Sequence, residues 1–253
     1  MGKLILGRAR TSNDVSTPTP VWVVLPTYNE AETIEPVVHA TRDNLPASRH
    51  VLVVDDGSPD GTGDVAARLA AELDDVSVLH RPVKGGLGPA YIAGLGAALE
   101  GGAGLVVQMD ADFSHDPAEL PRLIAATDEA DLVVGSRYTE GGRVTDWGYG
   151  RIAISRWGSR YARIVLGIRV HDMTSGFKCW RRAALEAVDL VSIRSHGYAF
   201  QVEMTYRARE AGMRIVEVPI TFRDRRVGES KMTGSIVLEA AMRVPGMRFR
   251  GRG

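Results

Sequence analysis

Short apolar runs recur along this chain, and each is followed by a segment with helical spacing. The runs occupy residues 21–25, 51–54, 76–79, 105–109 and 132–134. Strands that alternate with helices are typical of a parallel sheet whose two faces are both covered. The pattern therefore predicts an α/β fold, with a doubly wound, mostly parallel sheet and helices on both faces.

The rest of the chain carries weaker signals of the same kind. We expect helices over residues 30–45, 149–166 and 200–211, others ending near residues 73 and 101, and a strand over residues 215–218. We find no internal repeat and no linker that divides the chain. The helix over residues 149–166 is predicted to be amphipathic.

Length and composition fit a single large globular domain. The chain has 253 residues, of which 44% are hydrophobic and 25% charged. We expect a disordered tail over residues 1–20, one domain over 21–235, and a basic helix or tail over 236–253. Within the domain, residues 21–136 are predicted to bind a nucleotide and residues 137–235 an acceptor.

One predicted strand ends in two carboxylates, Asp110 and Asp112. Two uncompensated charges at a strand end repel each other and resist desolvation, and a hard divalent cation removes both problems. Mg²⁺ commonly binds one or two carboxylates and completes its shell with phosphate oxygens and water. The pair predicts an Mg²⁺ or Mn²⁺ site that holds a phosphorylated substrate, although many Asp-x-Asp pairs are solvated loop acids.

Polar residues also follow the other predicted strands. They are Pro26 to Glu30, Asp55 with Asp56, and Gly135 to Arg137. Ligands of doubly wound sheets bind beyond the carboxyl ends of the strands. We therefore expect these clusters to meet Asp110 and Asp112 at one edge of the sheet.

Two familiar glycine-rich nucleotide motifs are absent. The first strand is followed by Pro-Thr-Tyr-Asn-Glu instead of Gly-x-Gly-x-x-Gly, and no Gly-x-x-x-x-Gly-Lys-Ser/Thr segment occurs. A metal ion and basic side chains would have to hold the phosphates instead. Residues 224–231 carry Arg225, Arg226 and Lys231, whose charges suit a diphosphate.

Together these motifs resemble the inverting glycosyltransferases of family 2, and among them the polyprenyl (dolichyl) phosphate mannose synthases. The resemblance spans roughly residues 20–235. It rests on residues 26–30, 55–62, 86–91, 110–112, 135–138, 172–177, 200–204 and 228–231, which occur in this order. It implies a GT-A-like fold and transfer of mannose from GDP-mannose to a polyprenyl phosphate, with inversion.

The resemblance also implies roles for individual residues. Asp110 and Asp112 would bind the metal, and Asp112, Arg225 and Lys231 would be catalytic. Arg137, Arg151 and Ser155 would bind the acceptor phosphate. The nucleotide sugar would contact Pro26, Tyr28, Glu30, Val54, Asp56, Asp110, Ala111, Asp112, Arg225 and Lys231.

The acceptor chemistry removes the need for a general base. The second pKa of a phosphate monoester is about 6, so its oxygen is already largely ionised at neutral pH. His115 is the one histidine in a motif at a strand end, and we expect it to shape the turn. One departure concerns the metal: some relatives have Gln two residues after the second Asp, where this chain has Ser114.

The expected surroundings follow from cysteine content and hydropathy. Cys179 is the only cysteine, which favours a reducing compartment, and no apolar run reaches the roughly 18 residues of a membrane span. We expect a cytoplasmic protein attached peripherally to the cytoplasmic face of a membrane, by its surface or through a membrane-protein partner. Basic and acidic residues balance at 31 each, and no nucleic-acid partner is expected.

Two alternatives remain at this point. The same fold could use UDP-glucose or another sugar nucleotide with the polyprenyl phosphate. The protein could also be a catalytically silent subunit that regulates another transferase. The intact pair of Asp110 and Asp112 favours an enzyme.

Overall fold

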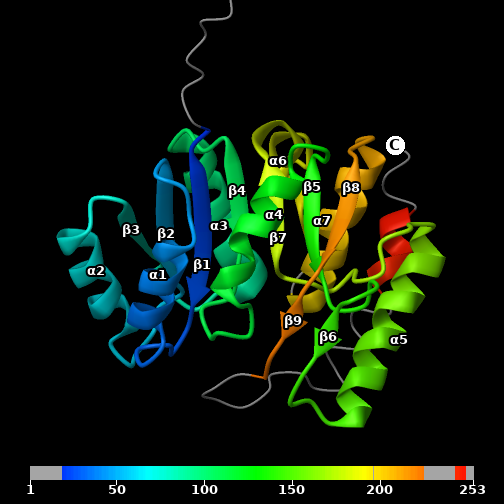
Figure 1. Ribbon diagram of the computed structural model, residues 1–253, viewed down its shortest axis with the longest axis horizontal. Coiled ribbons are helices and arrows are strands. Elements are labelled where there is room, and N and C mark those ends of the chain that lie inside the picture. Colours follow the sequence, from blue (N-terminus) through cyan, green and yellow to red (C-terminus); the bar gives the residue numbers. More distant parts are fainter. Residues whose placement is uncertain (1–18, 196, 225–242, 249–253) are drawn as a thin grey trace, which may run out of the picture.

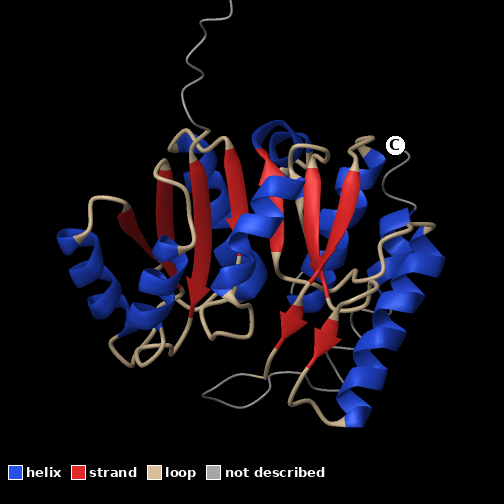
Figure 2. Ribbon diagram, in the orientation of Figure 1, coloured by secondary structure: helices blue, strands red, loops and turns tan. Residues whose placement is uncertain are grey.

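The computed structural model describes residues 19–195, 197–224 and 243–248. Its main sheet has seven strands in the order β3-β2-β1-β4-β7-β5-β8 (Figures 1 and 2). They are β1 Val21–Thr27, β2 Arg49–Asp55, β3 Val76–His80, β4 Leu105–Gln108, β5 Leu132–Ser136, β7 Lys178–Arg181 and β8 Ile215–Pro219. All neighbours are parallel except β7, which is antiparallel to both β4 and β5. The predicted mostly parallel α/β sheet is confirmed.

Helices cover both faces of this sheet (Figure 2). They are α1 Ile34–Asp43, α2 Thr62–Glu72, α3 Leu87–Glu100, α4 Leu120–Ala126, α5 Tyr149–Leu166, α6 Arg182–Ala187 and α7 Gly197–Glu210. Short 3₁₀ turns occupy Pro117–Glu119 and Leu190–Ser192, and β6 Arg143–Val144 pairs with β9 Thr221–Phe222 in a small second sheet. The predicted bounds of α5 are confirmed, whereas α1 is shorter than predicted at both ends.

Two hydrophobic layers form because successive strand residues point to opposite faces. In β1, Val23 and Leu25 pack with α1, α2 and α4, while Val24 packs with α3 on the other face. Glycine allows one close approach: a Cβ on Gly94 of α3 would lie 2.5 Å from Val24. Strands buried on both faces explain the continuous apolar runs in the sequence.

The insertion of β7 was not predicted from the sequence. Its residues are Lys178, Cys179, Trp180 and Arg181, a composition unlike that of the other buried strands. Because β7 runs against its neighbours, the segment before it arrives at the carboxyl ends of β4 and β5. This segment, residues 172–177, therefore joins the polar clusters at that edge.

No helix within the described ranges combines the length and apolar composition that spanning a bilayer requires. The predicted tail over residues 1–20 and the basic segment 236–253 lie mostly outside these ranges. The division into nucleotide-binding and acceptor-binding halves stays a prediction.

Candidate active site

A cavity of about 330 Å³ opens at the carboxyl ends of β1, β2 and β4. Seven of the predicted donor-binding residues line it: Pro26, Tyr28, Glu30, Asp56, Asp110, Ala111 and Asp112. The structure thus brings together residues from three strand ends, as the topology of a doubly wound sheet predicts. Val54 instead lies in the hydrophobic core.

A larger cavity of about 990 Å³ lies beside α7 and residues 243–247. Two of its charged side chains neutralise each other, since Arg207 Nη2 lies 2.6 Å from Glu203 Oε1. It is also lined by none of the strand-end clusters. We therefore place the candidate active site in the smaller cavity.

Asp110 and Asp112 are held by different contacts. The Asp110 Oδ1 atom accepts a hydrogen bond of 2.9 Å from the Tyr91 hydroxyl, and 26% of this side chain remains exposed. The Asp112 Oδ1 atom accepts the Ser114 backbone N–H at 3.0 Å, and Asp112 is 4% exposed. Burial, and then the adjacent Asp110 carboxylate, raise the pKa of Tyr91 well above its usual value, so this hydroxyl stays a donor.

His115 shapes the turn after β4. Its Nδ1 atom accepts the Asp110 backbone N–H at 3.1 Å, so the proton of the neutral ring is on Nε2. Burial lowers the pKa of His115, although Asp110 and Asp112 oppose this shift. The ring stacks on Phe177 with centroids 4.9 Å apart. These contacts confirm the expected structural role.

The carboxylate oxygens at this turn are suitable ligands for a hard divalent cation. Within the described residues, no group of three or more His, Cys, Asp or Glu side chains is arranged to hold a metal ion. Two carboxylates are sufficient for Mg²⁺ or Mn²⁺ when phosphate and water supply the remaining oxygens. The Ser114 hydroxyl is buried and lacks a hydrogen-bond partner among the described residues.

Asp56 organises the glycine-rich loop at the opposite side of the cavity. Its carboxylate accepts the backbone N–H groups of Gly85 and Gly86, at 3.0 and 2.7 Å, and pairs with Arg81. This anchoring places the Lys84 Nζ atom 3.6 Å from the centre of the Tyr28 ring. A cation over an aromatic ring that lines the cavity adds positive charge where a nucleotide is predicted to bind.

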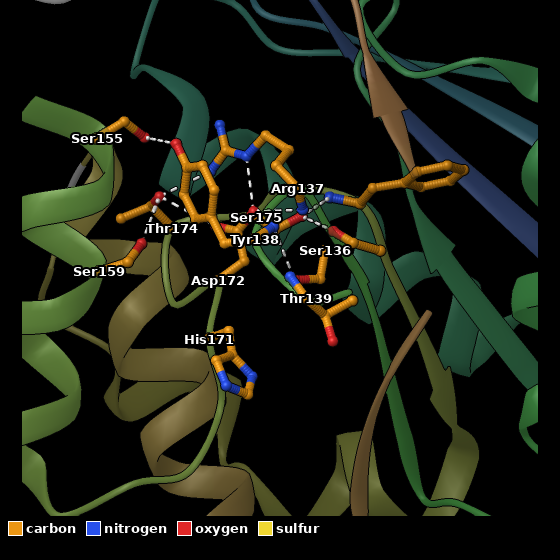
Figure 3. A network of polar contacts seen from close by, with 12 residues as sticks. Ser136, Arg137, Tyr138, Thr139, Ser155, Ser159, His171, Asp172, Thr174 and Ser175 are labelled. Atoms are coloured by element: carbon orange, nitrogen blue, oxygen red, sulfur yellow. Dashed lines mark hydrogen bonds and ion pairs between the residues drawn. The ribbon is translucent and has the colours of Figure 1, made fainter. Parts of the chain in front are cut away.

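The predicted acceptor residues form a network beyond the Asp110 turn (Figure 3). Arg137 Nε and Nη2 donate to the two carboxylate oxygens of Asp172, both at 2.7 Å, and Nη2 also donates to Thr174 at 2.8 Å. The Tyr138 hydroxyl donates to Ser155 Oγ at 2.7 Å. Burial alone would raise the pKa of Asp172, but the Arg137 guanidinium and its hydrogen bonds hold that pKa below its usual value.

Arg151, the third of these residues, lies over the Trp147 ring, which Arg137 also approaches at 5.7 Å. Its guanidinium donates to Asp224 at 2.9 Å and is centred 3.9 Å from the Trp147 ring. The acceptor roles of Arg137, Arg151 and Ser155 stay predictions. Arg225 and Lys231, predicted to be catalytic, lie outside the described residues.

Sequence reasoning gave no role to several residues of the cavity wall. The wall includes Lys84, Thr174, Gly176 and Gln201. The Tyr91 hydroxyl also donates a hydrogen bond to Asp110. The segments 172–177 and 200–204 were noticed as motifs; the first reaches the cavity because β7 runs antiparallel, and the second lies in α7, where Phe200 stacks on Tyr91 of α3. No spacing rule for parallel strands could have placed them.

Comparison with known proteins identifies the family. Residues 22–189 match the model of the glycosyl transferase family 2. The chain belongs to this family. It is 53% identical over 224 residues to the undecaprenyl-phosphate mannosyltransferase of Micrococcus luteus, covering 88% of this chain and 92% of that protein. It is 48% identical over 232 residues to the polyprenol monophosphomannose synthase of Mycolicibacterium smegmatis, covering 91% and 87%.

Two solved structures of another enzyme share the fold of this glycosyltransferase. Glucosyl-3-phosphoglycerate synthase from Mycobacterium tuberculosis, in complex with phosphoglyceric acid, superposes with a TM-score of 0.67 at 22% identity, covering 90% of this chain and 81% of that one. Its complex with Mn²⁺, UDP-glucose and phosphoglyceric acid gives a TM-score of 0.66, covering 90% and 80%. The GT-A-like architecture is confirmed.

Proposed function

We propose that this glycosyltransferase transfers mannose from GDP-mannose to the phosphate of a polyprenyl phosphate, with inversion at the anomeric carbon. The observation that carries the proposal is the cavity in which Asp110 and Asp112 meet five other predicted donor residues. The names of two relatives near 50% identity support the sugar and the lipid acceptor. A lipid acceptor also requires the enzyme to work at a membrane surface.

Asp110 and Asp112 would hold Mg²⁺ or Mn²⁺, and a bound cation would stabilise negative charge that develops on the diphosphate. The solved complex of glucosyl-3-phosphoglycerate synthase with Mn²⁺ and UDP-glucose supports a role for a metal ion. Tyr91 and the Ser114 N–H hold the two carboxylates in place. Lys84 adds positive charge on the nucleotide side, beside Tyr28.

The acceptor phosphate would attack without help from a base. Its oxygen is largely ionised at neutral pH, since the second pKa of a phosphate monoester is about 6. His115 fits this view, because its Nδ1 atom is occupied by the Asp110 N–H and its pKa is lowered by burial. Arg137 and Arg151 would orient the phosphate, which requires exchange of part of their present carboxylate contacts.

A transfer assay with GDP-[¹⁴C]mannose and purified polyprenyl phosphate tests the proposal, with UDP-glucose as the competing donor. We expect labelled lipid from GDP-mannose, and ¹H NMR of the product should show the β-anomer. If UDP-glucose gave labelled lipid and GDP-mannose did not, the proposed donor would be wrong.

Asp112→Asn tests the carboxylate pair in the same assay. Asn retains an oxygen for the Ser114 N–H but loses the charge, and loss of one such electrostatic contact typically reduces the rate by about 10²–10³-fold. Asp128→Ala, at an exposed acid, is the matched control and should retain activity. Full activity of Asp112→Asn would remove Asp112 from the proposed metal site.

A further inference from the structure

Helix α5 lies on the outer edge of the molecule and carries a concentrated positive charge (Figure 1). Residues 147–171 contain no Asp or Glu but have five arginines, Arg151, Arg156, Arg160, Arg163 and Arg169. This imbalance is local, because the whole chain has equal numbers of basic and acidic residues. Arg151 pairs with Asp224, and the segment has no acid of its own to neutralise the other four arginines.

Three of these arginines have no partner in the described part of the chain. Arg160, Arg163 and Arg169 take part in none of its ion pairs, although they lie together along a groove of about 680 Å³. Two exposed arginines elsewhere in the described residues do have acidic partners. Arg209 pairs with Glu210 at 2.6 Å, and Arg214 pairs with Glu129 at 3.5 Å.

Large apolar side chains are exposed on the same helix. Tyr149 is 93% exposed, Ile164 68%, Trp157 56% and Ile154 47%. Trp157 stacks on Tyr161 with ring centroids 5.4 Å apart, so the aromatic face is continuous over one turn. Helices with arginines beside Trp and aliphatic residues are typical of the membrane interface, where apolar groups insert and guanidinium groups meet phosphates.

We propose that one surface docks on an anionic phospholipid bilayer; it is formed by the exposed side of α5 and the turn after it, with Ile154, Trp157, Arg160, Arg163, Ile164 and Arg169. Charge complementarity favours an anionic partner, and the exposed aliphatic residues favour a lipid over a nucleic acid. This deepens the proposed function by naming the surface that faces the membrane.

The opposite face of α5 explains why docking would be productive. Ser155 and Ser159 point inward, where Ser155 accepts from Tyr138 and Ser159 contacts Thr174 at 3.4 Å (Figure 3). One helix thus has the bilayer on its outer side and the predicted acceptor-phosphate residues on its inner side. A lipid headgroup would have a short path from the interface to the cavity.

Vesicle binding tests this surface without any turnover. Sedimentation with phosphatidylcholine vesicles, with and without 30% phosphatidylglycerol, is compared for the wild type and the triple variant Arg160→Gln, Arg163→Gln and Arg169→Gln. Each basic residue near an anionic surface contributes about 1 kcal/mol, so the triple variant should partition roughly 100-fold more weakly. The control replaces Arg122, Arg209 and Arg214 by Gln, which removes the same charge from exposed pairs on other elements.

Trp157 provides a second readout. Insertion should shift the tryptophan emission to shorter wavelength with anionic vesicles, and Trp157→Phe should abolish most of this shift. Equal binding by the two triple variants would overturn the proposal. So would preference of the wild type for a single-stranded oligonucleotide over vesicles. Failure of mannose transfer alone would count against the proposed function and not against this surface.

An independent observation concerns Gln201 and the fully buried Lys178. The Lys178 Nζ atom donates to the Gln201 carbonyl at 2.9 Å and to its Oε1 atom at 2.7 Å. Because an ammonium or amine group at this position donates both bonds, the amide oxygen of Gln201 must face Lys178. The amide Nε2 is then directed away from Lys178.

This Nε2 atom is buried and has no hydrogen-bond partner among the described residues. Gln201 also lines the donor cavity. A Cβ on Gly176 would lie 3.5 Å from Gln201 Nε2 and 3.6 Å from Asp110 Oδ1, so the amide is close to the proposed metal site. A buried donor without a partner destabilises the free protein, and a ligand oxygen that accepts its hydrogen bond would offset this cost.

We infer that Gln201 donates a hydrogen bond to a hydroxyl of the donor sugar and that Lys178 is its positioning residue. This inference rests on the proposed function. The sugar of a nucleotide sugar follows the diphosphate, and Gln201 shares its part of the wall with Thr174, which contacts the acceptor network.

Calorimetry of GDP and GDP-mannose binding, with Mn²⁺, separates a contact of Gln201 with the sugar from a general effect on nucleotide binding. In Gln201→Glu an oxygen still faces Lys178, but the amide donor is lost. Affinity for GDP-mannose should fall roughly five- to tenfold while affinity for GDP is unchanged. A GDP-deoxymannose that lacks the hydroxyl contacted by Gln201 should bind the wild type and Gln201→Glu with equal affinity.

Three results would contradict these expectations in different ways. Loss of GDP affinity in Gln201→Glu would assign the amide to the diphosphate. Unchanged GDP-mannose affinity would remove Gln201 from the sugar site. If the wild type bound GDP-mannose no better than GDP but bound UDP-glucose tightly, the proposed donor itself would be wrong.

Discussion

Single buried charges in this protein are stabilised by partners from distant segments. Arg137 follows β5 and Asp172 precedes β7, and their side chains are 5% and 0% exposed. Two hydrogen bonds of 2.7 Å join them, and Thr174 completes the contact. Such a pair holds the end of β5 and the segment before β7 together at the site, and each buried charge is compensated by the other.

Asp172→Ala should therefore lower the free energy of unfolding by about 3–5 kcal/mol, because it leaves the Arg137 guanidinium buried without its partner. Urea denaturation followed by circular dichroism measures the change. The double variant Arg137→Leu with Asp172→Leu should recover part of the loss. A loss below 1 kcal/mol in Asp172→Ala would mean that water reaches Arg137.

Lys178 should give stability a dependence on pH. Burial lowers the pKa of Lys178 to about 7 in the folded protein, against 10.5 in the unfolded chain. Between these values the unfolded chain binds a proton that the folded protein does not, so the free energy of unfolding rises with pH. Cys179 has the opposite effect above pH 9, since burial raises the pKa of its thiol to about 12.

The effect of Lys178 on stability is therefore best measured between pH 7 and 8.5, below the range in which Cys179 titrates. Wild-type stability should rise there by about 1 kcal/mol per pH unit, and Lys178→Met should remove most of this slope. Urea denaturation at three pH values measures it. A slope that persists in Lys178→Met would assign the titration to another group.

Residue chemistry at strand ends could be predicted from sequence, and pairing between distant residues could not. Asp56, Asp110 and Asp112 were placed correctly because each follows an apolar strand. Arg137 was expected to serve a phosphate, yet 35 residues separate it from Asp172, the partner that it contacts. Only the folded chain brings that carboxylate to it.

Helix α3 packs very closely against the sheet at one glycine. A Cβ on Gly94 would lie 2.5 Å from Val24 Cγ1 and 2.7 Å from Val54 Cγ2, whose branched side chains have little freedom to move. A Cβ on Gly96, two residues along the same helix, would meet nothing within 4 Å. The two glycines thus form a matched pair.

Gly94→Ala should lower the free energy of unfolding by about 1–3 kcal/mol, because overpacking outweighs the gain in helix propensity. Gly96→Ala should raise it by up to about 1 kcal/mol, since only propensity and chain entropy change. Thermal and urea denaturation measure both. Stabilisation by both substitutions would show that α3 can move away from the sheet.

The elements also mark the limit of pattern recognition. Runs of Val and Leu predicted β1, β2, β4 and β5, and apolar spacing predicted α5 to the residue. The strand β7 carries a lysine that is buried only because Gln201 receives its hydrogen bonds. A charged residue in a central strand contradicts the usual composition, so local pattern did not indicate it.

At the scale of the whole molecule, the candidate active site is an open cavity in which Asp110 and Asp112 lie one residue apart. A nucleotide without metal would meet these two negative charges directly, and a metal without nucleotide would find a carboxylate pair but no larger group of acids or histidines among the described residues. GDP and Mn²⁺ together should therefore raise the melting temperature more than the sum of their separate effects.

Differential scanning fluorimetry measures this coupling, with EDTA to reverse it. Asp112→Asn should lose the coupling while keeping the melting temperature of the free protein within a few degrees. Strictly additive effects of GDP and Mn²⁺ on the wild type would indicate two separate sites.

The antiparallel direction of β7 has a consequence for how such proteins diversify. The chain leaves the sheet at the end of β5 and re-enters it at the start of β7, at the same edge. The segment between these two strands includes α5. The Arg137–Asp172 pair holds the two ends of this segment side by side. If the predicted division into two halves holds, exchange of this segment for another would change the second substrate and leave the predicted nucleotide-binding residues in place.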